Sequence, residues 1–227
     1  MLQFHFSLAP NPMKVALFLE EAGLPYEAIP VNTRKGDQHA PAFLALNPNA
    51  KVPVIVDGDA VVFDSNAILI YLGQKTGQFM PADTPKARGE MLSWMMFIAS
   101  GIGPYSGQAV HFTRFAPEPR EYGATRYTFE ARRHFAIVEA RLADHAFMLG
   151  DHYTIVDMAL WGWARLIPFV LGEETMDSMP NLKRLIATIN ARPATERAIG
   201  LKDKHVFEVV PDDVARQNMF RHLVTAA

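Results

Sequence analysis

Apolar positions follow two different periods along this chain, and the place where the period changes divides it into two parts. The first clear helical pattern lies between residues 12 and 22, where positions i, i+3, i+4 and i+7 form one apolar face: Val15, Phe18, Leu19 and Ala22. Gly23 and Pro25 end this predicted helix. Pro12 suits its first position, because a proline has no N–H to leave unpaired there, and Asn11 is then the predicted N-cap.

The rest of the first part alternates short strands with helices. Strand patterns cover residues 2–6, 26–31, 52–57 and 60–63. Helical patterns cover residues 40–46 and 65–76. The Asp57-Gly58-Asp59 turn favours a hairpin, so the last two strands are expected to be antiparallel. This order predicts an α/β fold with a mixed four-stranded sheet, which we place in a domain of residues 1–79.

The second part carries helical patterns only. It follows a polar, proline-bearing segment, residues 80–85, which is typical of a linker. The helical patterns cover residues 86–114, 121–147, 154–170 and 181–191. We therefore predict an all-α helical bundle as a second domain, residues 86–227, in which the tail after Gly200 has no assigned element.

Two local signals refine this helical part. Gly101, Gly103 and Pro104 are expected to kink or interrupt the first of its helices. Thr154 and Asp157 have the spacing of a capping box, with Asp in place of Glu, and are expected to begin the third.

Charge and composition exclude two classes of partner. The 227 residues are 49% hydrophobic and 20% charged, and the formal net charge of −2 offers no basic field for a nucleic-acid backbone. No apolar run approaches the roughly 18 to 20 residues that a membrane-spanning helix needs. The first residues lack a basic leader followed by an apolar run and a small-residue cleavage site, so we expect a cytoplasmic protein.

The chain contains no cysteine, and this restricts its chemistry. Disulfides, protein thiolate nucleophiles and sulfur-ligated metals are all excluded. The eight histidines show no i, i+3 or i, i+4 pair, so we predict no metal site. Any thiol chemistry must therefore come from a bound molecule.

Two segments carry a resemblance that covers nearly the whole chain. "NPNAKVPVIVDGDAVVFDSNAILIYL" begins at Asn47 and "GDHYTIVDMAL" begins at Gly150; with the order of the elements, they resemble the glutathione S-transferase family. "GPYSGQAVHF" at residues 103–112 and the helix start at Asn11 are most similar to its bacterial nu-class branch and to relatives of the yeast prion-forming nitrogen regulator. The resemblance implies a thioredoxin-like N-terminal domain, an all-helical C-terminal domain and glutathione as co-substrate.

By this resemblance, glutathione would lie against the segment around Pro53. The family has a cis peptide bond before this proline, which lets the N–H and C=O of Val52 pair with the cysteinyl part of glutathione like a neighbouring strand. The alternative is that "KVPV" only starts a buried strand.

The resemblance assigns the two ends of glutathione to further residues. Ser65 lies at a predicted helix start, where free N–H groups and the helix dipole favour an anion such as the γ-glutamyl carboxylate. Asp64 would pair with the neighbouring α-amino group, although the family more often has Glu or Gln there. Gln38 and Lys51 match positions that contact the glycyl end or the peptide backbone. The alternatives are an ordinary Asp/Ser helix cap and two solvated surface side chains.

Asn11 occupies the family position whose side chain donates a hydrogen bond to the glutathione sulfur. Lowering a thiol pKa from about 8.5 to roughly 6.5 requires about 2.7 kcal/mol of preferential thiolate stabilisation. One amide hydrogen bond to a charged acceptor supplies roughly 1.5 to 3 kcal/mol. The asparagine carbonyl would cap the helix while its NH₂ group faces the thiolate. Nu-class relatives often have a threonine where this chain has Ala9, and Ser7 is a further candidate donor.

The helical domain is expected to supply the site of the second substrate. "ATRYTFEARRHF" resembles a nu-class segment whose arginine, Arg126 here, helps to bind glutathione carboxylates and can do so across a dimer interface; otherwise it is a surface arginine. Tyr105, His111 and Phe112 either line the electrophile site or pack as aromatic core. The Met-rich and aromatic face of residues 91–112 lies where the family dimerises, so we expect a two-fold homodimer.

We therefore predict an enzyme, either a glutathione S-transferase or a glutathione-dependent disulfide-bond oxidoreductase. Its bound glutathione thiolate would attack a small hydrophobic electrophile or a disulfide. The alternative is a non-catalytic member of the same fold that binds glutathione or a partner. Because the chain has no thiol, any disulfide exchange would pass directly between glutathione molecules and the substrate.

Overall fold

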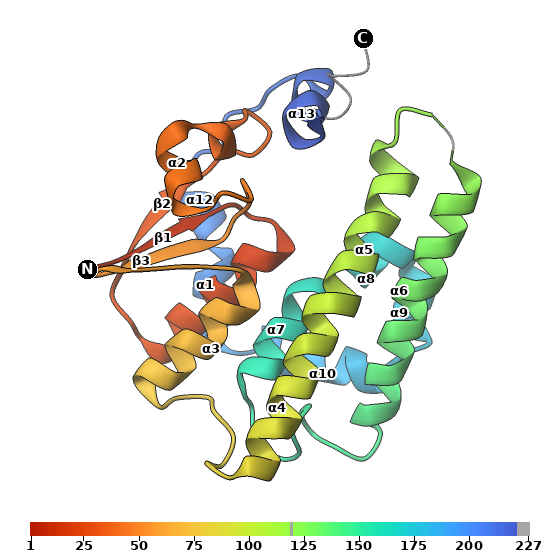
Figure 1. Ribbon diagram of the computed structural model, residues 1–227. Helices are drawn as coiled ribbons and strands as arrows, with labels where there is room; N and C mark the ends of the chain where they lie inside the picture. The colour runs from red at the N-terminus through yellow and green to blue at the C-terminus, as the bar shows by residue number, and fades with distance from the viewer. Residues whose placement is uncertain (119, 222–227) are drawn as a thin grey trace.

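The computed structural model describes residues 1–118 and 120–221, with a small sheet-containing part followed by a larger helical part (Figure 1). The strands are β1 (Leu2–Phe6), β2 (Tyr26–Pro30), β3 (Val54–Asp57) and β4 (Ala60–Phe63). The helices beside them are α1 (Pro10–Ala22), α2 (Pro41–Leu46) and α3 (Ser65–Thr76). Residues 119 and 222–227 of the predicted helical domain lie outside the described residues.

The sheet is mixed, as the sequence predicts. Its strand order is β2-β1-β3-β4, with β1 and β2 parallel and β3 antiparallel to both of its neighbours. A parallel pair needs a crossover connection, and α1 supplies it between β1 and β2. Gly58 turns the β3-β4 hairpin with a φ of 65°. The thioredoxin-like N-terminal fold is confirmed.

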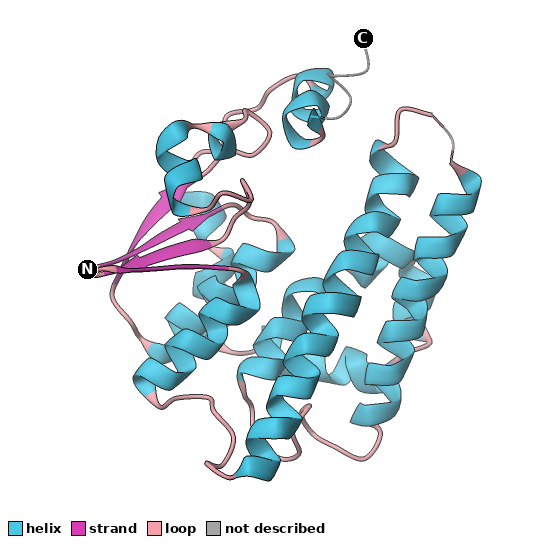
Figure 2. Cartoon of the chain, in the orientation of Figure 1, coloured by secondary structure: helices cyan, strands magenta, loops and turns pink. Residues whose placement is uncertain are grey.

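The two faces of the sheet carry different helices (Figure 2). Side chains of β1 alternate between them. Phe4 and Phe6 are fully buried in the main core, together with α1 and α3. His5 points to the other face, where its ring lies 6.0 Å from that of Phe43 on α2. The main core thus lies on the α1 side, and it continues into the helical part.

The helical part contains ten α-helices within the described residues. They are α4 (Pro85–Phe97), α5 (Gly103–Val110), α6 (Glu121–Leu142), α7 (Ile155–Ala164), α8 (Ile167–Leu171), α9 (Glu173–Asp177), α10 (Pro180–Asn190), α11 (Pro193–Ile199), α12 (Leu201–Lys204) and α13 (Asp212–Met219). No strand follows β4 in residues 64–118 and 120–221. In this same part of the chain, no helix is both long enough and apolar enough to cross a membrane. The all-helical C-terminal fold is confirmed, whereas the exact division at residues 80–85 stays a prediction.

The long helix predicted over residues 86–114 is continuous but distorted. Wide π-helical turns at Ile98–Ile102 and His111–Phe115 flank α5, so the interruption expected near Gly101 is present as a widened turn. The capping box of Thr154 and Asp157 also begins α7 as predicted.

Two helix ends differ from the prediction. The helix expected to reach residue 147 ends at Leu142, because Arg184 of α10 donates to the carbonyls of Leu142 and His145, at 2.9 Å each, and satisfies this end of the helix. The helix expected over 154–170 is divided into α7 and α8, since Pro168 near the start of α8 cannot continue a helical ladder.

Candidate active site

Asn11 is not the N-cap of α1, so that prediction is wrong. The helix begins at Pro10, and Ala9 is its extended N-cap, without a side-chain capping bond. Asn11 is therefore the second helical residue. Prolines at positions 10 and 12 are both tolerated, because the first N–H groups of a helix have no partner within it.

The carbonyl of Asn11 is instead held by the helical part of the fold. Nε1 of Trp163, on α7, donates to Oδ1 of Asn11 at 3.0 Å. An indole N–H can only donate, so this contact determines which end of the amide is oxygen. The NH₂ end of Asn11 is consequently the end that can donate to a ligand.

Asn11 lines a cavity of about 370 Å³ between the sheet part and α5. The wall comes from the first turn of α1, the start of α3, the segment before β3, and α5 with α7. Its polar side chains include Asn11, Lys14, Lys51, Asp64, Ser65 and Trp163. Three of the predicted glutathione-binding residues therefore share one cavity with the predicted thiol-activating residue.

The start of α3 is a capped helix N-terminus. Asp64 is the N-cap with a φ of 72°, and its Oδ1 accepts from the N–H groups of Asn66 and Ala67 at 2.9 and 3.1 Å. Ser65 is buried, and its Oγ lies 3.3 Å from Nζ of Lys14. Asp64 thus has the ordinary capping function that the sequence offered as an alternative; its contact with an α-amino group stays a prediction.

Lys14 is a cavity residue that the sequence analysis missed. Its side chain is only 1% exposed. Burial lowers its pKa from 10.5 to about 7, and the negative charge of Asp64 opposes this shift. The sequence does indicate this burial, because Lys14 lies four residues before Phe18 and therefore on the apolar face of the predicted helix.

A second cavity, of about 380 Å³, adjoins the first. Ser7, Gln38 and Val52 line it, and Lys51 lines both cavities. The peptide bond between Val52 and Pro53 is cis, as the family resemblance implies. The segment around Pro53 therefore lies between the cavity of Asn11 and the surroundings of Gln38.

Gln38 contacts a late segment of the described chain through Asn218. Its side chain is buried, and Nε2 donates to the carbonyl oxygens of Thr33 and Asn218 at 3.2 and 3.1 Å. We name residues 206–221 the C-terminal strap, since this segment crosses back to the sheet part and contributes Met219 and Arg221 to the wall of the second cavity. Gln38 is thus not a solvated surface residue. Its NH₂ group is bound to the protein, so the two ends of its amide are not both free for a ligand.

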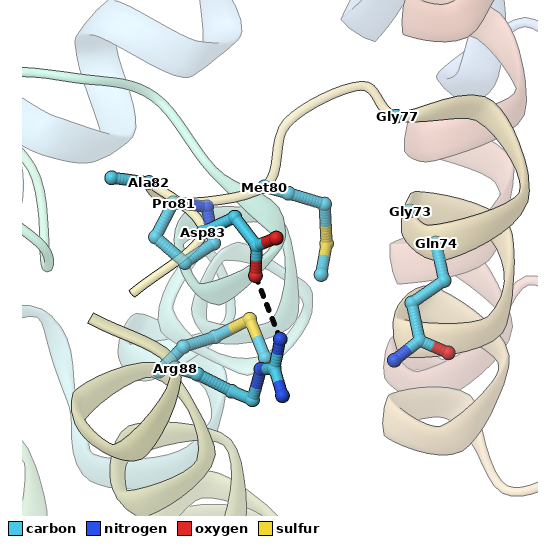
Figure 3. Close-up of a pocket in the computed structure, with 9 residues that line it drawn as sticks. Gly73, Gln74, Gly77, Met80, Pro81, Ala82, Asp83 and Arg88 are labelled. Carbon is cyan, nitrogen blue, oxygen red and sulfur yellow. Dashed lines mark hydrogen bonds and ion pairs between the residues drawn. The ribbon is translucent and has the colours of Figure 1, made fainter. Parts of the chain in front are cut away.

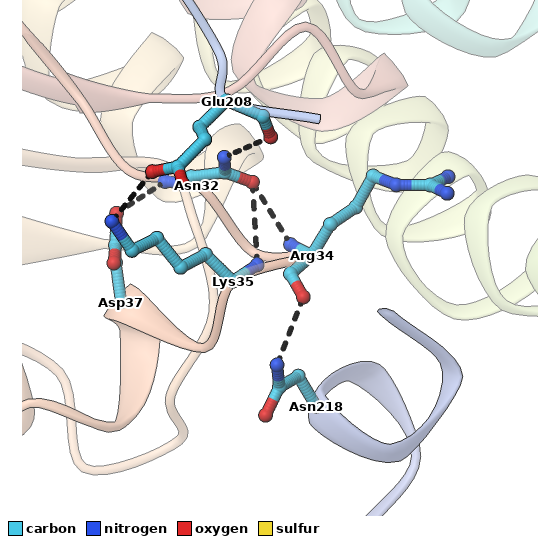
Figure 4. A network of polar contacts seen from close by, with 6 residues as sticks. All are labelled: Asn32, Arg34, Lys35, Asp37, Glu208 and Asn218. Atoms are coloured by element: carbon cyan, nitrogen blue, oxygen red, sulfur yellow. Dashed lines mark hydrogen bonds and ion pairs between the residues drawn. The ribbon is translucent and has the colours of Figure 1, made fainter. Parts of the chain in front are cut away.

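Further polar contacts tie the strap to the loop before Gln38 (Figure 4). Nδ2 of Asn32 donates to the carbonyl of Glu208 at 2.8 Å, and Lys35 forms an ion pair with the Glu208 carboxylate at 2.6 Å. Nδ2 of Asn218 donates to the carbonyl of Arg34 at 2.9 Å. In Figure 1, α13 accordingly lies at the same end of the molecule as α2. This network positions the Gln38 wall of the second cavity.

The two halves of the chain each match a family model. Residues 9–75 match the model described as glutathione S-transferase, N-terminal domain, and residues 102–193 match glutathione S-transferase, C-terminal domain. The disulfide-bond oxidoreductase YfcG of Escherichia coli (strain K12) is 36% identical over 206 residues, which cover 88% of this chain and 94% of that protein. The chain belongs to the glutathione S-transferase family.

Solved structures of family members have the same fold. A glutathione transferase from Burkholderia graminis, with two glutathione molecules bound per subunit, is 39% identical with a TM-score of 0.84, and the match covers 90% of this chain and 89% of that one. A glutathione transferase from Pseudomonas putida, with one glutathione disulfide bound per subunit, is 32% identical with a TM-score of 0.81. That match covers 88% of this chain and 91% of the other.

The aromatic residues predicted for the electrophile site lie outside the cavity of Asn11. The Tyr105 ring lies 4.9 Å from that of His134 on α6, and the His111 ring lies 4.5 Å from that of Phe220 in the strap. Phe112 stacks on Tyr127 with 5.3 Å between ring centroids. On α5, the cavity of Asn11 is lined instead by Pro104, Gly107 and Gln108.

Arg126 also lies outside this cavity. It forms an ion pair with Glu130 one turn further along α6, and 48% of its side chain is exposed. With Phe112 and Tyr127 it lines a separate cavity of about 460 Å³. Within one chain, the structure therefore does not bring Arg126 together with Asn11 and Ser65.

A further cavity, of about 530 Å³, lies between α3 and the segment before α4 (Figure 3). Gln74 and Met80 line it, together with Asp83 and Arg88, which form an ion pair at 2.7 Å. None of the predicted site residues lies in this cavity. Across residues 1–118 and 120–221, no group of three or more His, Asp or Glu side chains could hold a metal ion.

Proposed function

We propose that the protein binds glutathione in the cavity of Asn11 and uses the bound thiolate to reduce disulfides or to attack small electrophiles. The observation that carries this proposal is the 3.0 Å hydrogen bond from Trp163 to Oδ1 of Asn11. It commits the amide oxygen to the protein, so the NH₂ group is oriented to donate to a sulfur atom. A hydrogen bond to a thiolate lowers the pKa of the thiol, because it stabilises the charged form.

Glutathione would lie across the two adjoining cavities. Its sulfur would face Asn11, and its γ-glutamyl carboxylate would face Ser65 at the start of α3. The peptide main chain would run along Val52, and the glycyl end would enter the second cavity near Gln38. Lys51, which lines both cavities, supports a single ligand that spans them.

In the proposed disulfide reduction, the glutathione thiolate attacks one sulfur of R–S–S–R, forms a mixed disulfide with it and releases R–S⁻. A second glutathione thiolate attacks the mixed disulfide, which gives glutathione disulfide and releases the other thiolate. The chain has no cysteine, so no protein thiol takes part. The oxidoreductase name of the Escherichia coli relative supports this scheme, as do the bound ligands of the two related structures.

An Asn11→Ala variant tests the proposal. The ultraviolet absorbance of the bound thiolate is followed against pH, and the apparent thiol pKa is expected to rise by roughly 1 to 2 in the variant. Turnover of a small dialkyl disulfide is expected to fall roughly 10- to 100-fold, with glutathione affinity within a few-fold of wild type. Asn49→Ala is the matched control, because it removes another amide from the same cavity wall.

Identical thiolate titrations of wild type and Asn11→Ala would contradict the proposed role of Asn11. Ser7 would then be the next donor to test, since its side chain is buried in the wall of the second cavity. Glutathione binding without turnover of aryl halides, hydroperoxides or disulfides would favour the non-catalytic alternative.

We further propose that the protein is a cytoplasmic homodimer. Large apolar side chains are exposed on β4 and α4: Val61, Phe63, Leu92 and Met96. A two-fold interface would cover such side chains. Because Arg126 lies apart from Asn11 within one chain, its proposed contact with glutathione would require this dimer. Sedimentation that finds only a 25.3 kDa monomer at micromolar concentration would contradict it.

A further inference from the structure

Lys14 is a buried cation in the wall of the cavity that contains Asn11. It lies three residues after Asn11 on α1, so both side chains are on one face of the helix. On α7, Gly162 leaves room for the lysine stem, since a Cβ atom there would lie 2.5 Å from Cγ of Lys14. The position of the ammonium group is therefore set by two helices from different parts of the fold, α1 and α7.

The ammonium group of Lys14 has polar but uncharged partners. Nζ lies 3.3 Å from Oγ of Ser65 and 3.5 Å from Oδ1 of Asn66. Within residues 1–118 and 120–221, no carboxylate forms an ion pair with it. Asp64 is the acid whose charge acts on it, and Lys51 is the other cation of the same wall. Burying a charge without a counter-ion is costly, and a bound anion would offset that cost.

The start of α3 offers an anion fewer N–H groups than an uncapped helix would. The N–H groups of Asn66 and Ala67 already donate to Oδ1 of Asp64. An anion at this end of α3 must therefore be held by other groups as well. The hydroxyl of Ser65 and the charge of Lys14 are the groups that line the cavity there.

We propose that Lys14 is the positioning residue for the γ-glutamyl α-carboxylate of glutathione, and that it acts through the hydroxyl of Ser65. An ammonium group can only donate, so Oγ of Ser65 accepts from it and directs its own O–H elsewhere. That O–H donates to the carboxylate, and the positive charge behind it strengthens the bond. The inference rests on the proposed function, because it takes glutathione as the ligand of this cavity.

Two S-methylated peptides test this inference without interference from the thiol. One is S-methylglutathione; the other has 4-aminobutanoyl in place of γ-glutamyl, so that only the α-carboxylate is missing. Affinities are measured by calorimetric titration at about pH 6, where Lys14, whose pKa burial lowers to about 7, is protonated. The ratio of the two dissociation constants reports the contribution of the carboxylate.

Wild type is expected to prefer S-methylglutathione by roughly 10- to 100-fold, the range for a hydrogen bond to a charged group. Lys14→Met removes the charge but keeps an unbranched stem, and should lower the preference to about three-fold or less. Ser65→Ala should lower it similarly. The double variant should lose no more than the larger single loss, because the two groups act in series. Lys75→Met is the control, since it removes a lysine that lines neither cavity and should leave the ratio unchanged.

An unchanged ratio in Lys14→Met would overturn the inference. A double variant whose loss is the product of the two single losses would overturn it too, because the groups would then act independently. Lys14→Gln replaces Lys14→Met in the same comparison if the methionine variant does not fold. Wild-type protein that binds neither peptide would refute the proposed function together with this inference, whereas binding with an unchanged ratio refutes the inference alone.

Discussion

The indole N–H of Trp163 donates to Oδ1 of Asn11 at 3.0 Å and so links α7 of the helical part to the first turn of α1. An asparagine side chain can rotate its amide, and either end can then face a ligand. The indole removes this freedom, because it has no acceptor to offer the NH₂ end. The candidate thiol-activating group is therefore oriented by a residue 152 positions away in the sequence.

Trp163→Phe is expected to weaken thiol activation without abolishing binding. Phenylalanine keeps an aromatic ring beside α5 but cannot donate, so Asn11 loses the bond that orients it. Turnover should fall roughly 5- to 15-fold, since the lost hydrogen bond contributes about 1 to 1.5 kcal/mol, while glutathione affinity changes little. Steady-state kinetics and the thiolate titration of the bound glutathione measure both effects.

Trp161→Phe is the matched control for this experiment. Nε1 of Trp161 donates to Oδ1 of Asn190 at 2.8 Å, which is the same kind of bond on the same helix. Neither residue lines the cavity of Asn11. The control should lose stability but keep the turnover of the folded protein. Equal losses of turnover in both variants would mean that Trp163 acts only on the stability of α7.

Local patterns were sufficient for the fold but not for every helix end. The four strands and α1 to α3 follow from period, turn residues and the Asp57-Gly58-Asp59 hairpin, because each signal lies within a few residues of its effect. The end of α6 depends on Arg184, about 40 positions away, and no local pattern contains it. The strap was unassigned for the same reason: it is held by contacts such as that of Glu208 with Asn32.

The candidate site shows the same limit. Asn11 was chosen through the family resemblance, and its predicted capping function was wrong because Pro10 already starts the helix. Its true partner, Trp163, lies on another helix, and helical spacing cannot indicate that contact. Lys14 is a different case, because a charged residue on an apolar helix face was visible in the sequence and marks a buried charge.

Gly162→Ala is expected to destabilise the protein by roughly 1 to 3 kcal/mol. A Cβ atom at Gly162 would lie 2.6 Å from the carbonyl oxygen of Pro10, which is main chain and cannot move without shifting α1. Gly107→Ala is the control, since a Cβ atom there would lie 3.7 Å from the Trp163 ring, an ordinary contact. Urea unfolding measures both. Equal stabilities of the two variants would contradict the close approach of α1 and α7.

Asn218→Ala is expected to loosen the C-terminal strap. It removes the hydrogen bond from Nδ2 to the carbonyl of Arg34. Losing about 1 kcal/mol of stabilisation raises the equilibrium constant for local opening of this segment roughly five-fold. Hydrogen exchange of the α13 amides should increase by this factor, with α7 unchanged. Asn181→Ala, which loses a bond from Nδ2 to Glu139 at 2.7 Å, is the control. If the control increases α13 exchange equally, the strap is not held by Asn218.

Lys14 should make the stability of the protein rise with pH between about 7 and 10.5, because burial lowers its pKa from 10.5 to about 7. In this range the unfolded chain keeps a proton on Lys14 that the folded chain has released, so raising the pH favours the folded state; below it, both states are protonated and the cost of the buried charge remains. Lys14→Met removes this titration, so the variant should be the more stable protein at about pH 6 and should lose that advantage toward about pH 10.

Lys75→Met is the control for this pH dependence. Lys75 is paired with Asp57, which raises the pKa of Lys75, so the stability difference between Lys75→Met and wild type should stay constant over this range. Urea unfolding at a series of pH values measures each difference, and a constant difference for Lys14→Met would mean that Lys14 stays protonated in the folded protein.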